Sequence, residues 1–112
     1  MKTMTTQRET RRVKTSIACN WGSTQDCPRN GTITSLGLKG CFVQTKAAAV
    51  EGQALYMNCW LPSQRWLPLR GQIVYYLPRV GFGLAFTDLT DSDREMLDLL
   101  IDYYDPQQQA PA

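Results

Sequence analysis

A group of arginines near the start of the chain has the residue type and spacing that suit binding of an anion. Arg8, Arg11 and Arg12 lie within five residues of one another, and residues 1–14 hold five basic side chains against one acidic side chain, a net charge of +4. Such crowding favours an anionic partner. Two other interpretations stay open: the basic residues only solubilise the start of the chain, or they form the solvated face of a short helix.

The charge changes sign along the chain, although the formal net charge is only +2. Residues 15–87 carry six basic and two acidic side chains, whereas residues 88–112 carry seven acidic side chains against Arg94, a net of −6. With 112 residues and 43% hydrophobic composition, the chain is typical of one globular domain and not of a disordered protein. The longest apolar run is Ala47–Val50, so we expect no membrane insertion, no secretory signal and a cytoplasmic location.

The residues used most often for catalysis and metal binding are absent or badly spaced. The sequence has no histidine, and Cys19, Cys27, Cys41 and Cys59 are separated by 7, 13 and 17 residues, without the close pair that zinc sites need. We expect these thiols to be small buried hydrophobic groups. Without a nucleophile motif, a phosphate-binding glycine loop or a close carboxylate pair outside the last helix, the sequence predicts a protein that is not an enzyme and has no cofactor or metal.

Short segments of alternating polarity predict a mainly β domain. In the first, Val13, Thr15, Ile17, Cys19 and Trp21 alternate with polar or small residues. The six segments expected to be strands are residues 13–21, 32–35, 41–45, 55–61, 69–77 and 82–86. Their even spacing favours an antiparallel barrel or sandwich over residues 13–87, and closure into a barrel would remove exposed edges.

The pattern changes near residue 88 to helical spacing, which predicts one amphipathic helix over residues 91–104. Ser92 and Glu95 have the spacing of a capping box at its start. We expect the helix to cover an open end of the barrel or to pack on its side, with docking of a partner as the alternative. Pro106 is expected to end the helix, and residues 105–112 to form a disordered tail.

Two motifs resemble those of the PilZ domain family. Residues 8–13 (RETRRV) are similar to the RxxxR motif that opens these domains, and residues 31–43 (GTITSLGLKGCFV) are similar to their second motif, (D/N)xSxxG. Segments 52–53, 71–74 and 81–89 resemble the later strands, so the resemblance covers residues 7–104 and leaves 1–6 as a flexible start. It implies a six-stranded antiparallel β-barrel with a C-terminal helix, which binds the bacterial second messenger cyclic di-GMP.

The resemblance assigns the ligand-binding arginines to an arm over residues 7–12. Arg8 and Arg12 match the two arginines of RxxxR, and Arg11 is an additional candidate for a phosphate contact. Cyclic di-GMP offers two phosphates and two guanines, and the planar guanidinium fork pairs with either group in bidentate fashion. We therefore expect the arm to fold over a ligand that is held against the barrel.

The second motif is only partly kept. Ser35 stands at the Asp/Asn position, Gly37 at the Ser position and Gly40 at the Gly position. Ser35 has a shorter reach than Asp, and Gly37 has no side chain, while Gly40 is expected where the backbone needs a positive φ or a close approach. The loss of two hydrogen bonds would cost roughly 1–3 kcal/mol and weaken binding about tenfold to a hundredfold.

Three classes of function are compatible with these residues. The first is a cyclic di-GMP receptor that signals to an unknown downstream protein; the second is a degenerate PilZ domain that does not bind the nucleotide and acts as an adaptor in pilus or motility control. The third, a nucleic-acid-binding barrel, would use Trp21, Trp60 and Trp66 with the basic arm. It is disfavoured, because we expect these tryptophans to be packing residues.

Overall fold

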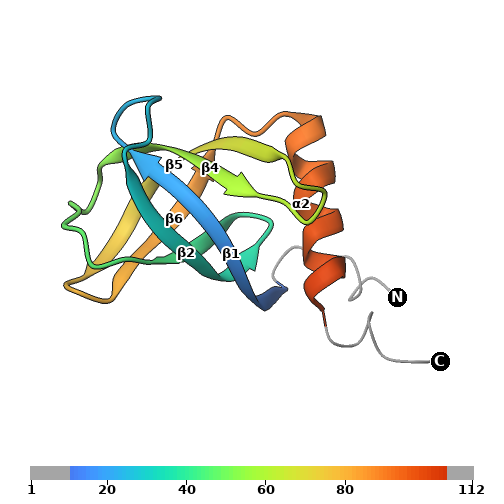
Figure 1. Cartoon of the computed structure of the whole chain (residues 1–112), viewed down its shortest axis with the longest axis horizontal. Helices are drawn as coiled ribbons and strands as arrows, with labels where there is room; N and C mark the ends of the chain where they lie inside the picture. Colours follow the sequence, from blue (N-terminus) through green and yellow to red (C-terminus); the bar gives the residue numbers. More distant parts are fainter. Residues whose placement is uncertain (1–10, 106–112) are drawn as a thin grey trace.

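The computed structural model describes residues 11–105, and these residues form a closed six-stranded barrel with one helix at its end (Figure 1). The strands are β1 (Arg12–Gly22), β2 (Arg29–Gly37), β3 (Gly40–Gln44), β4 (Ala54–Trp60), β5 (Trp66–Leu77) and β6 (Gly81–Thr87). Neighbouring strands are all antiparallel in the order β1-β2-β3-β6-β5-β4, with β4 paired back to β1. The prediction of a six-stranded antiparallel barrel is confirmed. The expected flexible start (1–6), residues 7–10 of the arm and residues 106–112 of the expected tail lie outside the described residues.

The alternation in the sequence places one face of each strand in the barrel core. In β1, the alternating residues Val13, Ile17, Cys19 and Trp21 are buried. The pairing with β2 shifts in register between Lys14 and Ile17. β2 is longer than the predicted segment 32–35, because pairing with β1 extends from Arg29 to Gly37. β5 likewise begins at Trp66, opposite Trp60, rather than at Leu69.

The tryptophans take two different roles. Trp21 is buried and meets Phe82 edge to face, with ring centroids 4.9 Å apart. Trp60 and Trp66 pack on each other at the β4–β5 turn, with centroids 4.8 Å apart, and both stay partly exposed. The packing role expected for Trp21 is therefore confirmed, whereas the other two contact mainly one another at the surface.

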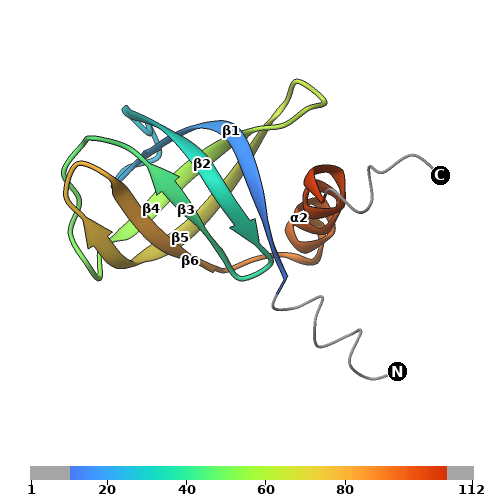
Figure 2. The same ribbon diagram turned by 90° about the horizontal axis from the view of Figure 1, so that it is seen from below.

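The helix α2 (Asp91–Tyr104) lies across one end of the barrel (Figure 2) and covers the range that the sequence predicts. It buries Leu97, Leu100 and Ile101 in the same core as the strands. The predicted capping box at Ser92 and Glu95 is wrong: Thr90 is the N-cap and Asp93 is its partner. Ser92 is already inside the first turn, so its hydroxyl cannot fill the position that precedes the helix.

All four cysteines are buried and free, as expected. Burial raises the pKa of the Cys19 thiol to about 12 and holds the pKa of Cys41 and Cys59 well above the ordinary value of 9.0. These thiols are therefore neutral packing groups at neutral pH. Within residues 11–105, no helix is long and apolar enough to cross a membrane.

Candidate functional site

A pocket of about 360 Å³ opens on the barrel wall and gathers residues from five of the six strands. Its lining consists of Arg12 from β1, Thr34 and Ser35 from β2, Cys41 and Phe42 from β3, Val74 and Tyr75 from β5, and Gly83 and Leu84 from β6. The lining thus combines a cation, three hydroxyl groups and two aromatic rings, one of which carries the third hydroxyl. This set suits a ligand that has both anionic groups and flat rings.

Arg12 and the stretch that resembles the second motif meet at this pocket. Antiparallel pairing places Arg12 opposite Gly37, and the Arg12 Nε donates a hydrogen bond of 3.1 Å to Ser35 Oγ. The arginine side chain therefore lies against β2 at positions 35 and 37. Of the six predicted site residues, the structure brings Arg12, Ser35 and Gly37 together.

Gly40 is required by a close approach of two strands. It pairs with Ala85 of β6, and a Cβ atom at this position would collide with the carbonyl oxygen of Leu84. Among the described glycines, only Gly52 and Gly81 have a positive φ, so of the two reasons expected for Gly40 it is the close approach that applies. Gly40 shapes the β2–β3 turn beside the pocket and does not line the pocket itself.

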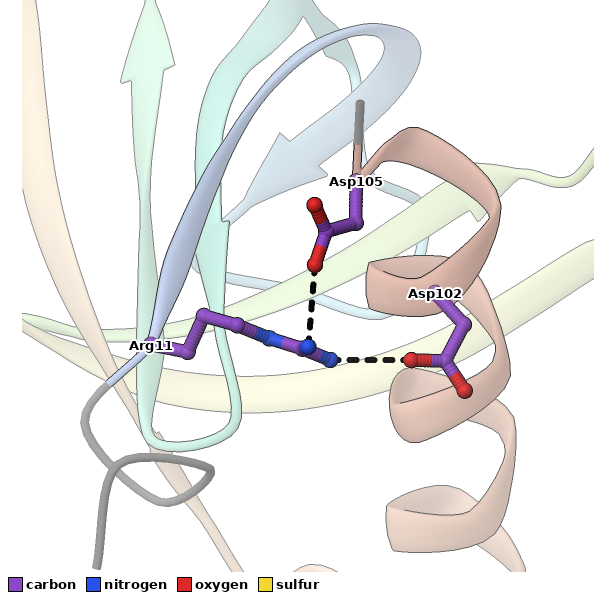
Figure 3. Close-up of polar contacts among 3 residues, drawn as sticks. All are labelled: Arg11, Asp102 and Asp105. Carbon is purple, nitrogen blue, oxygen red and sulfur yellow. Dashed lines mark hydrogen bonds and ion pairs between the residues drawn. The ribbon is translucent and has the colours of Figure 1, made fainter. Parts of the chain in front are cut away.

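Arg11 does not line the pocket, and its side chain points towards the end of α2 (Figure 3). Its Nη1 donates to Asp105 Oδ2 and its Nη2 donates to Asp102 Oδ1, each at 2.9 Å. The Arg11 side chain is 25% exposed and that of Asp105 only 10%, so this contact is partly shielded from water. The expectation that residue 105 belongs to a disordered tail is therefore wrong, because Asp105 is buried and held by Arg11.

The remaining predicted site residue, Arg8, lies outside the described residues, as does most of the arm that it belongs to. Arg12, at the base of this arm, is the member of the RxxxR match that the structure places in the pocket.

Two aromatic residues of the site, Phe42 and Tyr75, were not predicted from the sequence. Both pair with Gly83, from the strands on either side of β6. Because Gly83 has no side chain, the Tyr75 ring lies over it, where a Cβ atom would collide with the ring. The two rings are stacked with centroids 6.1 Å apart and an interplanar angle of 29°, and Tyr75 is 45% exposed.

One feature of the sequence could have revealed the space over Gly83 in which the Tyr75 ring lies. On β6, the residues that alternate with the buried Phe82 and Leu84 are Gly81, Gly83 and Ala85, all of them small. A strand with such an outer face leaves room for the side chains of its neighbours. The position of Tyr75 was hidden, because the register shifts between Ile73 and Tyr75.

Comparison with known proteins shows the family of the chain. The PilZ domain family matches residues 6–103, so the chain belongs to the PilZ domain family. PilZ domains are a family of cyclic di-GMP receptors and are typically non-catalytic. Among curated proteins, none matches the sequence.

Solved structures share the fold at low sequence identity. The inhibitor of motility MotI/DgrA of Bacillus subtilis matches with a TM-score of 0.70 and 12% identity, over 88% of this chain and 50% of that protein. This chain therefore spans half the length of MotI/DgrA. The PilZ domain of CeSA from a cellulose-synthesizing bacterium matches with a TM-score of 0.65 and 16% identity, over 81% of this chain and 94% of that domain. An uncharacterised Legionella protein matches with a TM-score of 0.58 and 13% identity, over 89% of this chain and 99% of that protein.

Proposed function

We propose that this domain is a cyclic di-GMP receptor that binds the nucleotide in the pocket on the barrel wall. One observation carries the proposal: Arg12, which matches the RxxxR motif, and Ser35, which matches the second motif, line the same pocket and are hydrogen-bonded to each other. Arg12 and Ser35 are 23 residues apart in the sequence, and their contact at one pocket supports the proposal.

The chemistry of the lining suits the two kinds of group in the ligand. The Arg12 guanidinium pairs with a phosphate or with the O6 and N7 edge of a guanine. The exposed ring of Tyr75, backed by Phe42, offers a flat apolar surface on which a guanine stacks. Ser35 supplies a short hydrogen-bonding side chain, and Gly37 supplies none, so we expect a lower affinity than a complete second motif would give.

The three arginines have separate roles in this proposal. Arg12 contacts the ligand from the barrel wall, and Arg8, on the arm, closes over it. Arg11 serves as the anchor of the arm, because its guanidinium is engaged by Asp102 and Asp105. In this proposal the Arg11 guanidinium is used for the contact with α2 rather than for a phosphate.

Isothermal titration calorimetry with cyclic di-GMP tests the proposal. Arg12→Ala should weaken binding by about 1.5–3 kcal/mol, the cost of a lost charge-assisted hydrogen bond, and the Arg8→Ala, Arg12→Ala double variant should weaken it further. Arg65→Ala, which removes an exposed arginine outside the pocket lining, is the matched control and should bind like the wild type. Binding should also weaken in high salt, since exposed charges are screened.

Unchanged affinity in the double variant would overturn the proposed site. The absence of any binding by the folded wild type would favour the second candidate, an adaptor domain that acts through a protein partner. The observation that favours the adaptor is the side chain missing at Gly37, where the family motif has a polar residue.

A further inference from the structure

The two departures from the family motif, at Ser35 and Gly37, both lie against the Arg12 side chain. Ser35 Oγ accepts the hydrogen bond from Arg12 Nε. A Cβ atom at position 37 would lie 3.3 Å from Arg12 Cγ, 3.4 Å from Arg12 Nη1 and 3.2 Å from the Arg11 carbonyl oxygen. A side chain at position 37 would therefore crowd Arg12, whose side chain would have to move by a few tenths of an ångström.

We propose that Ser35 and Gly37 act together as positioning residues for Arg12, so that their effect on the ligand passes through that arginine. Gly37 leaves the space in which the Arg12 side chain lies against β2, and Ser35 holds the Nε group of that side chain through its hydroxyl oxygen. This inference rests on the proposed function and adds to it how the binding arginine is held.

The hydrogen bond to Ser35 leaves the Nη1 and Nη2 groups of Arg12 available for a ligand. An arginine has five N–H donors, and the bond to Ser35 engages only the one on Nε. The four donors on Nη1 and Nη2 form the outer edge of the fork, which pairs with a phosphate or a guanine in bidentate fashion. Holding Arg12 in place before the ligand arrives reduces the ordering cost of binding.

From the family motif alone, a serine at position 37 would be expected to strengthen ligand binding, whereas the position of Arg12 leads to the opposite expectation. Replacing Gly37 by serine, the family residue, would add a hydroxyl but would also crowd Arg12 and the Arg11 carbonyl group. We expect Gly37→Ser to weaken binding, and Gly37→Ala to weaken it in the same way, since the displaced arginine and not the hydroxyl decides the outcome.

Two measurements on the whole chain test this inference. In the free protein, the NMR signal of Arg12 Nε–H should be protected from exchange in the wild type and in Ser35→Thr, which keeps the hydroxyl, and should lose protection in Ser35→Ala and Gly37→Ala. In calorimetry with cyclic di-GMP, Ser35→Ala should bind about 3- to 10-fold more weakly, and Ser35→Thr should restore most of the affinity. Ser16→Ala, at an exposed serine of β1, is the control and should change neither readout.

A double-mutant cycle separates positioning from direct contact. If Ser35 acts through Arg12, Ser35→Ala should have almost no further effect in an Arg12→Ala background. An equal loss in both backgrounds, or an Arg12 signal unaffected by Ser35→Ala, would overturn the inference. If the wild type binds no cyclic di-GMP, the proposed function fails, while the NMR comparison of the free proteins still decides whether Ser35 and Gly37 hold Arg12.

Discussion

Arg11 donates to Asp105 across 94 residues of sequence, at 2.9 Å. The residue that precedes the first strand is thereby held to the residue that ends the helix, and a second ion pair from the same guanidinium to Asp102 strengthens the attachment. The fork geometry of arginine allows one side chain to reach both carboxylates. The start of β1 and the end of α2 are therefore fixed relative to each other.

Removal of this attachment should lower stability. We expect Arg11→Ala to reduce the free energy of unfolding by roughly 1–2 kcal/mol, because two charge-assisted hydrogen bonds are lost at a partly shielded site. Arg11→Lys should recover only part of the loss, since lysine lacks the fork. Urea unfolding followed by circular dichroism measures the effect, with the exposed Lys46→Ala as control. An Arg11→Ala protein as stable as the wild type would show that the ion pairs contribute nothing.

Tyr75 should contribute to ligand binding through its ring rather than its hydroxyl group. Base stacking on an aromatic side chain contributes about 1–3 kcal/mol, so Tyr75→Leu should weaken cyclic di-GMP binding by about that amount, while Tyr75→Phe should keep it. Tyr103→Leu, at an exposed tyrosine of α2 outside the pocket lining, is the matched control for calorimetry. Wild-type affinity in Tyr75→Leu would exclude stacking on this ring.

Of the two hydroxyl residues at the start of α2, Thr90 and Ser92, only Thr90 caps the helix. Thr90 Oγ1 accepts from the Asp93 backbone N–H at 3.0 Å, and Asp93 Oδ2 accepts from the Thr90 N–H at 3.1 Å. Thr90→Ala should therefore reduce the free energy of unfolding by about 1 kcal/mol. Ser92→Ala should change it little, because Ser92 lies inside the first turn. Equal losses in the two variants would contradict the observed cap.

The buried thiols should make the fold less stable in alkali. Burial raises the pKa of Cys19 from 9.0 to about 12, so the folded protein holds this proton to higher pH than the unfolded chain does. The resulting stabilisation is fully present below the unfolded pKa of 9.0 and is lost as pH rises towards the folded pKa of about 12.

Urea unfolding at about pH 8 and about pH 10.5 measures this loss. Cys19→Ala is the control, and its stability should fall less steeply between the two pH values, whatever its starting stability. A wild type and a Cys19→Ala protein with the same pH dependence would mean that this thiol does not contribute.

The architecture could be predicted from the sequence, because the strands and the helix each follow from a local pattern of polar and apolar residues. Alternation in β1 and helical spacing in α2 each reflect burial of one face, and the family motifs located Arg12 and Ser35. The limits of β2 were set by pairing with β1, which no local pattern records. The choice of Ser92 for the capping box was wrong, because serine and threonine both occur at N-caps and only the backbone decides which one precedes the helix.

The rest of the site depends on contacts between distant segments. The opposite charges of the first and last segments were visible, but not that Arg11 forms ion pairs with Asp102 and Asp105. Tyr75 follows a shift of register in β5, so alternation could not show which way its ring points. The Tyr75 ring stacks on Phe42 because β3 and β5 both pair with β6 at Gly83.

The position of β6 in the barrel has a consequence for synthesis of the protein. β6 is the last strand in the sequence, yet it lies between β3 and β5 and pairs with both. A nascent chain that stops before Gly81 therefore carries two strands with open edges, which pair readily with other chains. Incomplete translation products of this domain are expected to be its most aggregation-prone form, and release of β6 from the ribosome is the event that removes both edges at once.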